Sequence, residues 1–103
     1  MRETQSLDQV VQLLQMVSQQ LAAVQAQVRE IEATLGHLTT QDPSRAIYQQ
    51  VGPLLIEVDD LETLQSNLSD SLGQLKGHLK TLEAKEAELR STYEEAVKQF
   101  ETA

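Results

Sequence analysis

Cysteine is absent from the chain and aromatic residues are scarce, and each shortage excludes a class of protein. Without cysteine there is no disulfide and no thiolate metal site, and nothing requires an oxidising compartment. The aromatics are Tyr48, Tyr93 and Phe100, whereas large aromatic side chains normally supply much of a globular core. This shortage, together with many Leu, Gln and Glu residues, predicts helices packed along a line and not a compact body.

Basic residues are also few. The chain has 8 Lys and Arg against 16 Asp and Glu, which gives a net charge of −8. This balance argues against nucleic-acid binding, which needs a positive surface, and against a polybasic membrane anchor. Residues 9–28 carry no formal charge, but their many Gln side chains are too polar for a bilayer core or a secretory signal. We therefore expect a cytoplasmic protein that binds neither nucleic acid nor a membrane.

Apolar residues recur at alternating steps of three and four along the first part of the chain. This 3.5-residue repeat is the seam of a left-handed coiled coil. Its members are Leu7, Val10, Leu14, Val17, Leu21, Val24, Val28, Ile31, Leu35 and Leu38. Because Pro43 disfavours helical geometry at Asp42, we expect this helix to span about residues 4–40.

A second seam predicts another helix over about residues 60–101. Asp59 and Glu62 have the spacing of an N-terminal capping box. The seam residues are Leu61, Leu64, Leu68, Leu72, Leu75, Leu79, Leu82, Glu86, Leu89, Tyr93, Ala96 and Phe100, with a stutter near Leu68. Two helices of similar length joined by a short connector should pack antiparallel, with both chain ends at one end of the arm.

Three residues of the second helix leave alternatives open. Glu86 is the charged residue of the seam, and it either fixes the register of the two helices or turns outward to solvent. Gly73 and Gly77 lie off the seam. They are either tolerated surface residues or a soft spot beside the stutter where the arm could bend.

Between the two helices the apolar period changes from 3.5 to 2, which predicts a β-hairpin over residues 45–58 with its turn at Gly52 and Pro53. A disordered loop is the alternative, but connections between helices are normally shorter and polar. An isolated hairpin with free edges and apolar faces would aggregate, and pairing with the hairpins of other subunits in a closed barrel removes the edges. The residues predicted to join subunits are Ile47, Tyr48, Val51, Gly52, Leu54, Leu55, Ile56 and Val58.

The order of these parts resembles a known family. A helix, then Asp-Pro-x-x-Ala-Ile-Tyr-x-x-Val-Gly-Pro-Leu-Leu-Ile-x-Val, then a helix is similar to a prefoldin subunit of the β type, over nearly the whole chain. Residues 46–58 are the most specific part. One hairpin is present, whereas the α-type subunit carries two, so the β type is the better match.

The resemblance implies a mainly α fold: a single domain over residues 1–103, made of a long antiparallel two-helix coiled coil and a β-hairpin. It also implies an ATP-independent holdase co-chaperone without a cofactor. Such α-type and β-type subunits form a hetero-hexamer whose hairpins build a β-barrel platform, and the arms hang below it. The arm tips hold unfolded client proteins, which pass to a group II chaperonin.

Large apolar residues off the seam gather at the free end of the arm, which supports client binding there. Val11, Leu13, Met16 and Val97 should be polar in a simple two-helix coil, and exposed apolar patches usually mark interaction sites. The same side chains could instead widen the packing stripe or touch a neighbouring arm. The predicted client-binding residues are Leu7, Val10, Val11, Leu13, Leu14, Met16, Tyr93, Val97 and Phe100.

An enzyme is not expected. His37 and His78 are not spaced as a metal pair and are expected to be solvated. The acidic residues alternate with basic ones, as on a solvated helix face, and no phosphate-binding loop or nucleophile motif is present. The alternative from another class is a structural coiled-coil adaptor, whose arms bind one specific helical partner.

Overall fold

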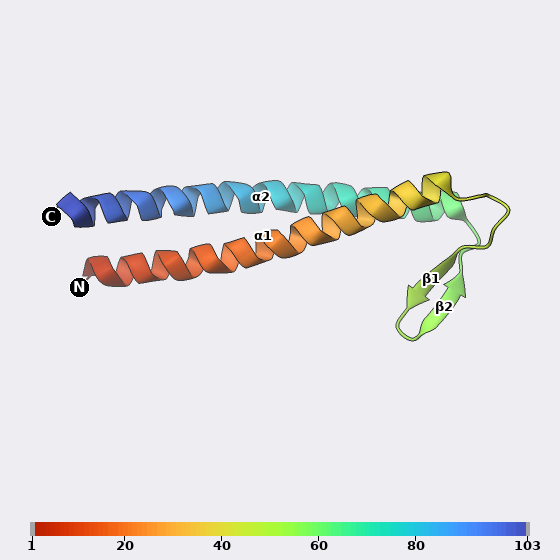
Figure 1. Cartoon of the computed structure of the whole chain (residues 1–103), viewed down its shortest axis with the longest axis horizontal. Coiled ribbons are helices and arrows are strands. Elements are labelled where there is room, and N and C mark those ends of the chain that lie inside the picture. The colour runs from red at the N-terminus through yellow and green to blue at the C-terminus, as the bar shows by residue number, and fades with distance from the viewer. Residues whose placement is uncertain (1, 103) are drawn as a thin grey trace.

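The chain forms two long helices that run antiparallel, with a small hairpin at one end (Figure 1). The computed structural model describes the backbone of residues 2–102 and the side chains of residues 7–101. In chain order the elements are α1 (Arg2–Thr40), β1 (Tyr48–Val51), β2 (Leu54–Glu57) and α2 (Leu61–Thr102). The molecule measures 70 × 25 × 16 Å, and its two termini lie together at the end opposite the hairpin. The predicted fold class is therefore confirmed.

The two seams face each other and supply the core. A cluster of buried side chains lies midway along the arm, formed by Val17, Val24, Val28 and Leu82. Half-buried leucines of both helices pack against it: Leu21, Leu72, Leu75, Leu79 and Leu89. Phe100 is the exception among the predicted seam residues, because 58% of its surface is exposed. At the end of α2 the seam prediction is therefore wrong for this residue.

A tight turn over residues 42–45 follows the end of α1. The carbonyl of Asp42 accepts a hydrogen bond from the N–H of Arg45 at 3.0 Å. Its carboxylate accepts two more from Ser44, from the N–H at 3.0 Å and the hydroxyl at 2.8 Å. Pro43 has its φ already fixed for the second position of such a turn. The backbone and hydroxyl hydrogen bonds from Ser44 hold the pKa of Asp42 below its usual value.

α2 begins with a cap one residue later than the sequence predicts. Asp60, and not Asp59, precedes the first helical residue, Leu61. The Asp60 carboxylate accepts a hydrogen bond from the Thr63 hydroxyl at 2.6 Å and one from the Thr63 N–H at 3.3 Å. The partner is therefore Thr63 at the third helical position, where the sequence pattern indicated Glu62. These hydrogen bonds hold the pKa of Asp60 below its usual value, and the bond from the Thr63 hydroxyl has the larger effect.

The hairpin strands pair in one register, from Tyr48 opposite Glu57 to Val51 opposite Leu54. A hydrogen bond of 2.8 Å from the Val58 N–H to the Ile47 carbonyl extends the ladder at its base. Gly52 has a φ of 60°, which a type II′ turn needs at its first central position. Pro53 cannot adopt a positive φ, so it fits the second position of that turn and excludes a type I′ turn.

Candidate functional site

The hairpin is a first candidate surface because it stands free of the helices. Among the described residues, neither strand packs against α1 or α2. The sheet has two strands, so each strand has one edge without a partner strand. Tyr48, Val51 and the run Leu54 to Ile56 are all exposed, with 69% of the surface of Leu55 accessible. A lone two-stranded hairpin of this kind is marginally stable in water.

The register separates the hairpin into an apolar face and a mixed face. Residues directly opposite each other share a face, and so do residues two apart along a strand. Val51, Leu54 and Ile56 therefore lie on one face, which is apolar except for Gln49 opposite Ile56. Ile47 and Val58 extend this face at the base. The other face is mixed and consists of Tyr48, Gln50, Leu55 and Glu57.

The base of the hairpin is less exposed than its tip. Ile47 and Val58 are half-buried, and both line a crevice of about 310 Å³ between the hairpin and the start of α2. Of the eight residues predicted to join subunits, these two are therefore partly covered by their own chain. The other six, including Gly52 in the turn, are exposed.

The free end of the arm is the second candidate surface. Leu13, Met16 and Phe100 are exposed there, Met16 by 56% and Phe100 by 58%. The other six predicted tip residues are half-buried: Leu7, Val10, Val11, Leu14, Tyr93 and Val97. Because Val11 and Val97 are half-buried, the structure favours the alternative that these two side chains widen the packed face between the helices. All nine belong to the part of α1 or α2 nearest its chain terminus, and the two termini lie together at one end of the arm (Figure 1).

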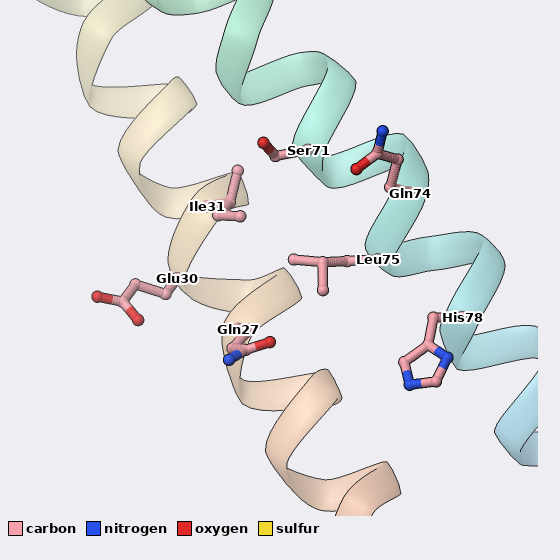
Figure 2. Close-up of a pocket in the computed structure, with 7 residues that line it drawn as sticks. All are labelled: Gln27, Glu30, Ile31, Ser71, Gln74, Leu75 and His78. Atoms are coloured by element: carbon pink, nitrogen blue, oxygen red, sulfur yellow. The ribbon is translucent and has the colours of Figure 1, made fainter.

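A groove between the helices midway along the arm was not predicted from the sequence. It encloses about 600 Å³ and is lined by Gln27, Glu30, Ile31, Ser71, Gln74, Leu75 and His78. Figure 2 shows Leu75 and Ser71 pointing toward α1, while Glu30 points away from α2. His78 is exposed at its rim. Among residues 7–101, no group of three or more acidic or histidine side chains is placed to hold a metal ion.

The glycines near this groove are not required by packing. A Cβ atom at Gly73 or Gly77 would meet nothing within 4 Å, and α2 is helical through both positions. The structure therefore favours tolerated surface glycines over a soft spot that bends the arm.

Glu86 faces the other helix and does not turn outward. One oxygen of its carboxylate, Oε2, accepts a hydrogen bond from the hydroxyl of Ser18 on α1 at 3.2 Å. The other, Oε1, lies 3.3 Å from the guanidinium of Arg90 on α2. The Glu86 side chain is 20% exposed. Ser18 had no signal in the sequence, because it lies beside the seam and not on it.

Known proteins match most or nearly all of the chain. The family described as prefoldin subunit matches residues 2–102. The chain belongs to the prefoldin family. Prefoldin subunit beta of Thermoplasma acidophilum is 30% identical over 95 residues, which is 92% of this chain and 74% of that protein. Prefoldin subunit beta of Thermoplasma volcanium is 32% identical over 68 residues, 66% of this chain and 55% of that protein.

A solved prefoldin structure shares the fold. The crystal structure of the prefoldin beta subunit from Thermococcus strain KS-1 superposes with a TM-score of 0.85 at 24% identity. The match covers 98% of this chain and 88% of that one. Together with the sequence matches, it confirms the predicted resemblance to a β-type prefoldin subunit.

Membership of the prefoldin family places the chain in a family of chaperones. Membership of this family implies assembly with other prefoldin subunits. Within residues 2–102, neither helix has the apolar stretch needed to cross a membrane.

Proposed function

We propose that this chain is a β-type subunit of a prefoldin hetero-hexamer that acts as an ATP-independent holdase. In this proposal the hairpin joins α-type and other β-type subunits, and the arm tips hold unfolded proteins until they pass to a group II chaperonin. One observation carries it: the exposed large apolar side chains gather at the two opposite ends of the arm, while the middle is packed.

Assembly through the hairpin follows from its free edges and its apolar face. Unpaired strand edges expose backbone donors and acceptors that a neighbouring strand can satisfy. The face formed by Val51, Leu54 and Ile56 would become the inside of a shared sheet, where burial stabilises by about 25 cal/mol for each Å² of apolar surface. Closing the hairpins of several subunits into a barrel leaves no edge open.

Client binding at the tip is supported by the kind of side chain exposed there. Leu13 and Met16 lie on α1 and Phe100 lies on α2, so both helices contribute. Met is flexible and polarisable, which suits contact with chains of varied sequence. The neighbouring polar residues of α1 are mostly Gln, so the α1 side of the surface carries little charge that would select among clients. On the α2 side, charged residues flank Phe100, among them Glu95 and Glu101.

Mass measurement and an aggregation assay test the proposal together. The chain mixed with an α-type partner should give a hexamer by native mass spectrometry and should suppress aggregation of several unrelated denatured proteins without ATP. A smaller complex that ignores unfolded chains would instead support the adaptor.

Substitution at the tip separates client binding from assembly. Changing Leu13, Met16 and Phe100 together to Ser should leave the hexamer intact and weaken suppression of aggregation. The matched control changes exposed polar residues of the same region, Gln12 and Gln15, to Ser. Equal suppression by both variants would count against the tip as the client-binding surface.

A further inference from the structure

The arm changes character at the point where Ser18 and Glu86 meet. Buried Leu82 lies on the hairpin side of this point, and buried Val17 lies level with it, as the residue just before Ser18 in α1. On the other side, no described side chain among residues 7–16 and 87–101 is buried. The hydrogen bond between Ser18 and Glu86 therefore lies at the border between a packed shaft and a loosely packed tip.

Glu86 occupies a position where the seam would otherwise have an apolar residue. Leu79 and Leu82 precede it at the seam spacing and Leu89 follows it. A carboxylate removed from water is costly unless its oxygens find partners. Here both oxygens are satisfied, Oε2 by Ser18 and Oε1 by Arg90. Among the described residues, no buried side-chain polar atom is left without a partner.

The two contacts of Glu86 have different consequences. Arg90 lies on the same helix, so this ion pair holds the carboxylate in place but does not join the helices. The Ser18 hydroxyl comes from the other helix, and a hydrogen bond tolerates little change in distance or angle. Leu and Val contacts permit sliding and rotation more readily. A polar contact within an apolar seam is a known means of fixing register at a cost in stability.

We propose that Glu86 is a positioning residue: held by Arg90 and hydrogen-bonded to Ser18, it fixes the two helices to each other at the border of the packed shaft and so limits how far the tip opens. Without this contact, the helices beyond it separate more widely and expose Leu14 and Tyr93, which are now half-buried. The limit on tip opening is inferred from the contacts of Glu86 with Ser18 and Arg90. Any effect of this limit on client binding rests on the proposed function.

Distances between spin labels on the two helices measure the opening directly. The natural chain has no cysteine, so Gln12→Cys and Glu95→Cys, both at exposed positions, place one label on each helix of the tip. Labelled chain is diluted into an excess of unlabelled chain, so that only pairs within one subunit contribute. Glu86→Ala and Ser18→Ala should shift the distance distribution to longer values and broaden it. Ser18→Thr keeps the hydroxyl and should preserve the native distribution.

Two controls separate positioning from general stability. Glu83→Ala removes an exposed carboxylate one turn away on the same helix and should leave the tip distances unchanged. A second label pair, Ala26→Cys with Lys80→Cys, lies on the shaft and should report the same distances in every variant. If the shaft and tip distributions broaden together, the effect is a general weakening of the arm and the proposal is wrong.

Each remaining outcome either supports or rejects the positioning role of Glu86. Unchanged tip distances in both Glu86→Ala and Ser18→Ala would overturn the proposal. If Glu86→Ala loses helicity by circular dichroism, Ser18→Ala carries the test, because it removes a single hydroxyl. The double variant should open the tip no further than Glu86→Ala alone, since both substitutions remove one shared contact. Longer tip distances in a chain that never suppresses aggregation would sustain the positioning role and reject the holdase function.

Discussion

The hydroxyl of Thr63 donates a hydrogen bond of 2.6 Å to the carboxylate of Asp60, at the point where the chain leaves the hairpin and α2 begins. This cap satisfies a backbone N–H of the first turn and marks the start of the helix at Leu61. Because the carboxylate accepts two hydrogen bonds from Thr63, its charged form is favoured in the folded chain.

Asp60→Asn and Asp60→Ala test this cap. Asn keeps an oxygen that can accept from Thr63 and should cost little, whereas Ala removes the acceptor and should lower the melting temperature measurably. Asp59→Ala is the matched control and should have almost no effect. Circular dichroism at fixed protein concentration measures all three, and equal effects at Asp59 and Asp60 would contradict the assignment.

The same residue predicts a dependence on pH. The pKa of Asp60 is lowered in the folded chain from its ordinary value of 3.8, so its contribution is complete above that value. The contribution is lost as the pH falls below 3.8 through the folded pKa, because the carboxyl is then protonated in both states. The difference in melting temperature between the natural chain and Asp60→Ala should therefore shrink in acid below that pH. A difference that stays constant down to strong acid would exclude this origin.

Two glycine substitutions should have opposite effects. Gly52→Ala forces a side chain into a backbone with a φ of 60° and should destabilise the hairpin by about 1 kcal/mol or more. Gly73→Ala lies in open space within α2 and should stabilise the chain by about 1 kcal/mol, because Ala favours helix over Gly. Urea unfolding of the assembled protein gives both changes. If Gly52→Ala were as stable as Gly73→Ala, the positive φ would not be a constraint.

The unequal burial along α2 predicts unequal costs of truncation. Leu82 is 5% exposed, so Leu82→Ala should cost about 2 kcal/mol of unfolding free energy, at the low end of the range because a thin arm can collapse around the cavity. Phe100→Ala should cost well under half of that, since its ring is mostly in solvent. Thermal and urea unfolding compare the two. A larger loss from Phe100→Ala would mean that the ring packs on the seam after all.

The apolar face of the hairpin predicts which substitutions prevent assembly. Ile56→Lys places a charge on the face shared with Val51 and should abolish the full complex at concentrations where the natural chain assembles. Gln50→Lys on the mixed face is the control and should assemble normally. Native mass spectrometry counts the subunits, and circular dichroism verifies that both variants keep their helices. Normal assembly of the Ile56→Lys chain would reject burial of this face between subunits.

Much of the fold could be predicted because each element has its own period. Steps of three and four leave one helical face apolar, and the change to a period of two between Ile47 and Val58 marks the strands. The turn was predictable too, because Gly52 and Pro53 restrict the backbone in complementary ways. These signals are local, so they need no knowledge of the partner helix.

What the sequence could not settle depends on distant neighbours. The orientation of Glu86 is decided by Ser18, 68 residues away along the chain, and no local pattern links the two. The exposure of Phe100 depends on how closely α1 approaches the end of α2. The cap is Asp60 and not the predicted Asp59. Two adjacent acidic residues fit the same sequence pattern, and only the path of the backbone into α2 distinguishes them.

The position of both chain ends at the tip has a mechanical consequence. A force that pulls the two helices apart there loads the seam one layer at a time, as in unzipping, and not all layers at once, as in shear. The half-buried layers between Leu7 and Leu14 would yield first. Resistance would rise where the force reaches Val17 and Leu82. A load on the arm is therefore relieved by reversible separation of its outer turns before it reaches the hairpin.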